Sequence, residues 1–387
     1  MLDVLIAGAG PAGSIAALVL ARAGARVLIV DREGFPRDKL CGDTLNPGAL
    51  NFLASLGLRG GPIEAARPLQ GMIVSSPRHT VRGMYSRGAV GRALTRRTLD
   101  AWLLSQAIDA GARFESGWIA REPLLADSSG SIAVRGLALA KRGQHQLWRV
   151  PAIMTIAADG GRSAIARHLG LTSNPQHPRR WAFGSYASGI TGVSEVGEMH
   201  VRPGHYVGIA PLTDVIANVC VVTGPRPGAR APIDVIRQAI AADPALAQRF
   251  EQAQFAPDVR VLGPLAVDAR APGVEGLLLA GDAAGFVDPM TGDGLHLAMR
   301  SGWLAAQEAL HSSECGDFAG AVARLARARQ QALGAKLRFN RAMRFVAGSA
   351  SAIQLGSYAA MVAPALLRRV VNYAGDVGRR GELLMRQ

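Results

Sequence analysis

The start of the chain follows a pattern of strand, glycine-rich turn and helix, which limits the fold more than any other feature. Residues 3–7 (DVLIA) predict a short buried strand, and residues 14–23 predict a helix rich in alanine and leucine. The turn between them has three glycines at G-x-G-x-x-G spacing, namely Gly8, Gly10 and Gly13. Residues 26–30 predict a second strand, which Asp31 closes. In this context the spacing indicates a dinucleotide-binding βαβ unit.

Each part of this unit has a physical role. The glycines permit a tight turn, close approach of a pyrophosphate, and close packing of helix on strand. Asp31 can accept hydrogen bonds from both hydroxyls of an adenosine ribose. Its charge would repel a 2′-phosphate, so NADP does not suit this site, whereas the spacing leaves NAD and FAD open.

Residues 277–302 (LLLAGDAAGFVDPMTGDGLHLAMRSG) repeat the pattern late in the chain. An apolar run predicts a buried strand, Gly281 and Asp282 begin a turn, and helical spacing of apolar residues follows Gly294. The start of a helix offers unpaired N–H groups and the positive end of a dipole. We therefore expect this turn to hold an anionic or electron-rich ring edge.

Three further segments add candidates to the same site. Residues 154–170 again read as strand, turn and helix, with Asp159 and Gly160 at the turn. Arg96 precedes a helix expected over residues 98–109 and is a candidate cofactor contact. Residues 35–50 form an ordered loop with Cys41 in the middle. Cys41 is either a small buried filler or a proton donor and polar neighbour of a cofactor ring.

The helical period largely disappears between Trp181 and Leu262, where short strands alternate with Pro and Gly, and one helix is expected over residues 233–250. The predicted fold is α/β. A discontinuous Rossmann-type domain comprises residues 1–70, 88–176 and 262–330, a β-rich substrate domain comprises 71–87 and 177–261, and a helical region comprises 331–387. The charge-free residues 345–367 fit three alternatives: buried helices lining a cavity, a membrane-surface helix, or a transmembrane helix.

Composition narrows the function classes. The net charge is +14, yet only three of the 43 basic residues are lysine, namely Lys39, Lys141 and Lys336. The basic residues are scattered and aromatic residues are 5%, so no nucleic-acid-binding module is indicated. The charge fits either a solvated surface or attraction to acidic substrates and anionic membranes. Three widely spaced cysteines form neither a disulfide framework nor a metal site, which fits a cytoplasmic protein.

Three motifs in this order, GAGPAG with Asp31, AADGGRS, and LLAGDAAGFVDPMTGDGL, resemble the flavin-dependent oxidoreductases of the para-hydroxybenzoate-hydroxylase-like superfamily. The RRTLD segment beginning at Arg96 and the loop around Cys41 are most similar to its geranylgeranyl-reductase-like branch. The resemblance implies FAD as cofactor and NADH or NADPH as electron donor. It places a flavin ring at the turn of residues 292–294, where the helix start would stabilise negative charge on reduced flavin.

Carried over position by position, the resemblance implies a set of cofactor contacts. They are Gly8, Gly10, Ala12, Gly13, Asp31, Arg32, Cys41, Gly42, Arg96, Asp159, Gly160, Gly281, Asp282, Pro289, Gly292, Asp293, Gly294 and Leu295. Candidate catalytic residues are Cys41, His296 as a proton relay beside the flavin, and Tyr206 in the substrate pocket. The alternative for His296 is an ordinary helix residue facing the core or solvent.

The chain departs from the family patterns at two places that bear on the substrate. Residues 206–211 (YVGIAP) replace the Trp and Phe of the reductases' lipid-contact motif with Gly and Ala, which suggests a roomier pocket. The lysine and the Trp motif of the halogenases are missing. The first hypothesis is hydride transfer at flavin N5 to an apolar polyprenyl, polyketide or quinone-like substrate. The second is an NAD(P)H-dependent monooxygenase, and halogenation or simple flavin binding ranks lower. Of the three alternatives for residues 345–367, buried helices lining a cavity are the first expectation, and peripheral membrane contact through the C-terminal helices is the next.

Overall fold

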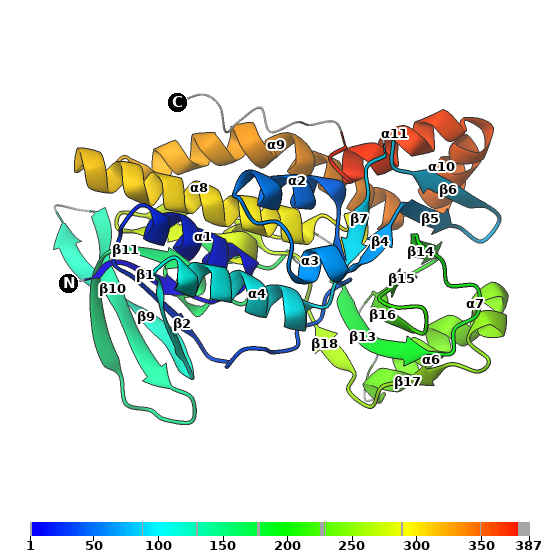
Figure 1. The fold of residues 1–387 in the computed structure, drawn as a ribbon, viewed down its shortest axis with the longest axis horizontal. Coiled ribbons are helices and arrows are strands. Elements are labelled where there is room, and N and C mark those ends of the chain that lie inside the picture. The colour runs from blue at the N-terminus through cyan, green and yellow to red at the C-terminus, as the bar shows by residue number, and fades with distance from the viewer. Residues whose placement is uncertain are drawn as a thin grey trace.

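The computed structural model describes residues 2–86, 88–128, 131–175, 179–224, 228, 230–287, 289–348 and 350–377. Two large sheets lie toward opposite ends of the long axis, and the long helices α8 (Gly294–Cys315) and α9 (Ala321–Gly348) run along one side of the first (Figure 1). The predicted class is therefore confirmed: α/β, with a Rossmann-type sheet, an antiparallel sheet and a helical C-terminal region.

The first sheet has a parallel centre in the order β21-β11-β1-β2-β8. These strands are β1 (Leu2–Ala7), β2 (Val27–Asp31), β8 (Arg113–Ser116), β11 (Trp148–Ala157) and β21 (Leu277–Leu279). Antiparallel strands extend it, namely β9 (Trp118–Ser128), β10 (Ser131–Lys141) and β20 (Gly273–Val274). Because β21, β11 and β1 are parallel neighbours, the three predicted glycine turns meet at one edge of this sheet.

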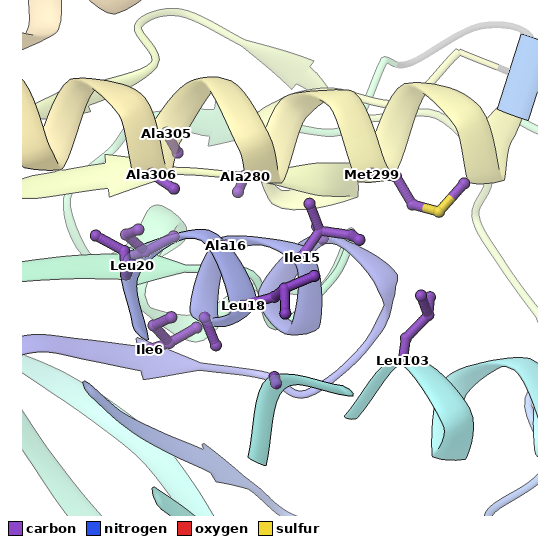
Figure 2. Close-up of a cluster of buried hydrophobic side chains, with 14 of the residues drawn as sticks. Ile6, Ile15, Ala16, Leu18, Leu20, Leu103, Ala280, Met299, Ala305 and Ala306 are labelled. Carbon is purple, nitrogen blue, oxygen red and sulfur yellow. The ribbon is translucent and has the colours of Figure 1, made fainter. Parts of the chain in front are cut away.

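Both faces of the sheet are covered, which explains why its strands are nearly continuous apolar runs. On one face lie α1 (Pro11–Arg22), α4 (Arg96–Asp109) and α8, and their buried side chains form the core shown in Figure 2. The β9–β10 hairpin and α5 (Ala164–His168) cover the other face. α4 begins two residues earlier than predicted because Thr95 caps it, accepting a hydrogen bond from the N–H of Thr98.

The second sheet has the order β17-β13-β16-β15-β14-β5-β6, with β18 also paired to β13. Its strands are β5 (Gly71–Ser75), β6 (Thr80–Met84), β13 (Trp181–Ser188), β14 (Gly197–Arg202), β15 (His205–Pro211), β16 (Ile216–Thr223), β17 (Gln254–Phe255) and β18 (Arg260–Leu262). The parallel pairing of β5 with β14 joins two distant segments that the sequence predicted to be β-rich. The exact domain boundaries stay a prediction.

The single helix predicted over residues 233–250 is wrong, because two helices occupy this segment. α6 (Pro232–Ala241) ends and α7 (Pro244–Arg249) begins within three residues. Asp243 caps α7 by accepting the N–H of Ala245 at 3.1 Å, and Pro244 disfavours helical backbone at the residue before it. Both helices pack on one face of the second sheet.

Short elements that the sequence did not reveal bridge the two large sheets. A small sheet of order β3-β7-β4 lies beside two helices. Its strands have two or three residues, which is too short to show an alternating pattern of apolar residues in the sequence. The elements are β3 (Thr44–Leu45), α2 (Pro47–Ser55), α3 (Pro62–Ala65), β4 (Arg67–Leu69), β7 (Gly91–Ala93), β12 (Thr172–Ser173), β19 (Asp268–Ala269), and the 3-10 turns η1 (Gly281–Ala284) and η2 (Pro289–Thr291).

The C-terminal helices are α9, α10 (Ala350–Val362) and α11 (Pro364–Ala374), and they contain the charge-free stretch of residues 345–367. No described helix is long and apolar enough to cross a bilayer. The expectation that this stretch is buried is wrong for many of its side chains, since Leu355 is 71% exposed and Phe345 is 78% exposed. The physical reason is one-sided packing: Leu367 and Val371 pack on β5 and β6, while Leu355 and Leu366 are left exposed by the part of the chain that the structure describes.

The crossing of α1 over α8 depends on Gly302. A Cβ atom at this position would lie 2.0 Å from the backbone oxygen of Ala12. We predict that Gly302→Ala lowers the free energy of unfolding by about 1–3 kcal/mol in urea titrations, because the two helices must move apart.

A matched substitution separates this clash from helix propensity. Gly356 is exposed in α10, and a Cβ there would meet nothing within 4 Å. Gly356→Ala should raise the stability by about 0.5–1 kcal/mol. If Gly302→Ala raised the stability by a similar amount, the close packing of α1 on α8 would be disproved.

Candidate functional site

The first glycine turn packs closely against neighbouring backbone. Gly8 has φ +100°, and a Cβ there would lie 2.4 Å from the carbonyl oxygen of Ala158. A Cβ on Gly13 would lie 1.8 Å from the carbonyl oxygen of Gly8. Asp31 stands at the end of β2 and accepts the N–H of Ala9 at 2.8 Å, so its carboxylate also fixes the turn. These contacts explain why glycine is required at both positions.

Positive charge gathers beside Gly10. A Cβ on Gly10 would meet only the guanidinium ends of Arg37, at 3.8 Å, and Arg96, at 4.0 Å. Arg96 is buried and forms two 2.6 Å hydrogen bonds with Asp100, whose carboxylate also lies 3.0 Å from Arg37. Two guanidinium groups therefore share one carboxylate, and the start of α1 adds unpaired N–H groups. This arrangement fits a pyrophosphate.

The second turn adds another cation and a capped helix. The ammonium of Lys39 lies 3.8 Å from the position of a Cβ on Gly160, and burial together with Arg96 lowers the pKa of Lys39. Asp159 accepts the N–H of Ala164 at the start of α5, and burial raises its pKa to about 6. Asp159 thus fixes the conformation of the turn, while Gly160 leaves space on the side where the phosphates are expected.

At the third turn, backbone and not side chain faces the expected ring. Gly292 has φ +67°, and a Cβ on Gly294 would meet nothing within 4 Å. The carboxylate of Asp293 is buried and points toward α9, where Asn340 donates to both of its oxygens at 3.1 Å. Leu295 packs into the core of the first sheet. The N–H groups that begin α8 are therefore the polar groups at this position, which fits the pyrimidine edge of a flavin.

The remaining predicted contacts lie around these three turns. Ala12 and Gly281 touch each other, since a Cβ on Gly281 would lie 2.9 Å from that of Ala12. Asp282 lies in η1, and Arg32 is exposed just after β2. Pro289 begins η2, although its side chain, like all of Asp288, lies outside the described residues. Individual cofactor contacts stay predictions.

An apolar cavity joins the loop of Cys41 to the third turn. It lies between Gly42 and Gly292 on one side and the second sheet on the other. Most of its wall is apolar, with side chains such as Leu45, Leu69, Met72, Met199, Ile209 and Met290 together with glycines. Polar side chains also line it, namely Thr44, Asn46, Tyr85, Glu198, Asn218, Cys220 and Thr291. The cavity therefore lies where a substrate would meet a flavin placed at Gly292–Gly294, and its chemistry favours an apolar substrate.

A buried carboxyl lies beside this cavity. Asp43 has φ +53° and is fully buried. Its carboxylate accepts hydrogen bonds from the hydroxyl of Tyr186 at 2.9 Å, the amide of Asn218 at 2.7 Å and the N–H of Arg96 at 3.1 Å. Burial nevertheless raises the pKa of Asp43 to about 6. Burial also raises the pKa of the Cys41 thiol, which faces Arg96 and stays protonated.

Sequence reasoning missed Tyr186 and Asn218 and gave Asp43 no role. One signal was available: Asn218 interrupts an otherwise apolar strand, so a polar side chain had to find a buried partner. No signal linked it to Asp43, since the two residues are 175 positions apart in the sequence.

Of the three catalytic candidates, only Cys41 adjoins the cavity, through its neighbour Gly42 and through its carbonyl, which accepts the amide of Asn218. The ring of His296 is buried, with Nδ1 3.0 Å from Asp376, and it is not part of the cavity wall. Tyr206 packs with Val222, Leu265 and other apolar residues, while Gly208 and Ala210 of the same strand line the cavity. Catalytic roles for all three stay predictions.

Comparisons with known proteins agree with this geometry. A family model described as an FAD binding domain matches residues 1–308. A digeranylgeranylglycerophospholipid reductase of Methanopyrus kandleri is 29% identical over 325 residues, which cover 81% of this chain and 78% of that protein. A menaquinone reductase of Mycolicibacterium smegmatis is 32% identical over 320 residues, which cover 79% of this chain and 75% of that protein.

Solved structures share this fold. A flavin-dependent brominase superimposes with a TM-score of 0.83 over 97% of this chain and 94% of that chain, and the two are 19% identical. That identity shows a shared fold and nothing finer. With the family model and the reductase relatives, the evidence is consistent: the chain belongs to the FAD-binding-domain family of para-hydroxybenzoate-hydroxylase-like FAD-dependent oxidoreductases.

Proposed function

We propose that this protein is a reductase that saturates a carbon–carbon double bond of an apolar prenyl or quinone-like substrate. The observation that carries the proposal is the apolar cavity between Gly42 and Gly292, which meets the expected flavin position. Bound FAD supplies a hydride at N5, and NADH or NADPH would supply the electrons. The two named reductases among the relatives support a substrate of this class.

The proton must come from a side chain or from a bound water. When an alkene is reduced, one carbon receives a hydride and the other receives a proton. Cys41 suits this role because burial keeps its thiol protonated and it adjoins the cavity. The carboxyl of Asp43, two residues away and with a pKa near 6, is a second group that can bind a proton. It accepts a hydrogen bond from Asn218 of the cavity wall. We assign proton delivery to Cys41 and its resupply to Asp43.

We further propose that the protein is cytoplasmic and docks on an anionic bilayer through α10 and the adjoining ends of α9 and α11. Six large apolar side chains are exposed here, namely Phe345, Leu355, Tyr358, Met361, Val362 and Leu366. Arg341, Arg368 and Arg369 are exposed at the margins of this patch and suit anionic headgroups. α11 packs on β6, whose following residue Tyr85 lines the cavity, so the patch adjoins the substrate site.

Anaerobic half-reactions test the reductase. Holoenzyme reduced chemically without oxygen should be reoxidised by a geranylgeranyl lipid or by menaquinone, and the product should carry two added hydrogens on the carbons of a former prenyl double bond rather than on the quinone oxygens. A fully saturated analogue of the lipid is the control and should leave the flavin reduced. Reoxidation that needs oxygen and yields a product with an added oxygen atom would replace the reductase with the monooxygenase.

Asp43 should make stability depend on pH. Its pKa rises from 3.8 to about 6 on folding, so its protonated form stabilises the folded state at low pH, and that stabilisation is lost as pH rises through 6. Between about pH 4 and pH 7 the free energy of unfolding of the wild type should fall by about 3 kcal/mol more than that of Asp43→Asn. Asp258→Asn, at an exposed carboxylate, is the control. If the free energy of unfolding fell equally with pH in the wild type and in Asp43→Asn, the raised pKa of Asp43 would be ruled out.

Sedimentation with phosphatidylglycerol vesicles tests the docking patch. Leu355→Ser with Val362→Ser should weaken binding by about tenfold or more, because each variant removes apolar area from the bilayer contact. Val215→Ser is a matched control, since Val215 is 68% exposed and Val362 is 64% exposed. Phosphatidylcholine vesicles should bind less well. Equal binding by the double variant and the control would reject this surface.

A further inference from the structure

A cluster of buried polar side chains ties the third glycine turn to the C-terminal segment of residues 373–376. Its members are Asp293 and His296 of the α8 start, Lys336 and Asn340 of α9, and Asp376 after α11. Each is 6% exposed or less. These residues come from three separate elements, and none of them except Asp293 and His296 is suggested by the cofactor motifs.

Lys336 stands at the centre. Its ammonium donates to the carbonyl of Tyr373 at 2.6 Å, to the carbonyl of Ala374 at 2.7 Å and to the carboxylate of Asp376 at 3.0 Å. It also lies 3.6 Å from the carboxylate of Asp293. An ammonium has three N–H donors on a compact centre, so it can serve this crowded point where a planar guanidinium would not fit.

Lys336 faces two acidic side chains. Among the described residues, the buried carboxylates of Asp293 and Asp376 both lie within 4 Å of this ammonium, and His296 adds a ring nitrogen 3.0 Å from Asp376. Lys336 and His296 lower the pKa of Asp376, which keeps it ionised. Removing the ammonium would take away the cation that these two buried carboxylates share, which is destabilising.

The position of Asp293 links this cluster to the flavin. Asp293 stands between Gly292 and Gly294 and immediately precedes α8, whose free N–H groups lie at the expected pyrimidine edge. The hydroxyl of Thr291 and the amide of Asn340 fix the carboxylate of Asp293. The positions of Gly292 and Gly294 therefore depend on the contacts that hold Asp293, and one of these contacts is the ion pair with Lys336.

We propose that Lys336 is a positioning residue that fixes the Gly292–Gly294 turn and sets the reduction potential of the bound FAD. The ammonium balances the carboxylate of Asp293 behind the turn that faces the expected ring, which favours the added negative charge of reduced flavin. The C-terminal segment of residues 373–376 belongs to the same assembly. The proposal rests on FAD binding alone and holds for any substrate.

The test compares two lysines. Lys336→Met keeps the length of the side chain and removes the charge, and Lys141→Met makes the same change at an exposed site. The holoproteins are equilibrated with a reference dye to measure the midpoint potential, and FAD affinity is measured by fluorescence titration. Lys336→Met should lower the potential and weaken FAD binding by about tenfold or more, while Lys141→Met should match the wild type.

If Lys336→Met does not fold, a second variant, Asp376→Asn, still tests whether this cluster sets the reduction potential. Asp376→Asn leaves Lys336 to balance Asp293 alone, so the potential should rise, opposite to the effect of Lys336→Met. In the Lys336→Met background, Asp376→Asn should recover part of the lost FAD affinity. A role in packing alone would lower thermal stability without moving the potential. An unchanged potential in both Asp376→Asn and Lys336→Met, or shifts of the same sign, would overturn the proposal.

Discussion

The parallel pairing of β21, β11 and β1 is the constraint on which the site depends. Backbone hydrogen bonds continue that pairing past the strands, since the N–H of Ala280 donates to Ala157 at 2.9 Å and that of Ala158 donates to Ala7 at 2.7 Å. Three turns distant in sequence are thereby held at the spacing of adjacent strands. Glycine is needed at Gly8 and Gly13 because the backbones approach too closely for a side chain.

Charged and apolar side chains occupy different regions around these three turns. The pyrophosphate end gathers Arg37, Lys39 and Arg96 around Asp100. The reacting end holds two groups whose pKa burial raises, Cys41 and Asp43, beside an apolar cavity. An anionic cofactor therefore suits the first region, and a largely apolar substrate suits the cavity.

The cofactor half of the site was predictable because its signals are local. Strand, turn and helix follow one another within each unit, and Asp31 closes the first at a fixed distance. Asp43, Tyr186 and Asn218 were not predictable as a group, because their contacts join segments more than a hundred residues apart. His296 could be located on α8, but its partner Asp376 lies 80 residues later. Likewise, an uncharged stretch does not reveal which side of a helix is packed, so the exposure of Leu355 appeared only in three dimensions.

The C-terminal segment also bears on how this protein is made. Asn46 donates to the carbonyl of Ala374, and the N–H of Gly48 donates to that of Gly375, so the start of α2 contacts a segment that is synthesised more than 300 residues later. Domains generally fold as units while the ribosome extends the chain. Here Asn46 can cap α2 by itself, since its side chain accepts the N–H of Ala49. The N–H of Gly48, however, has its backbone partner only once residues 373–376 have been synthesised.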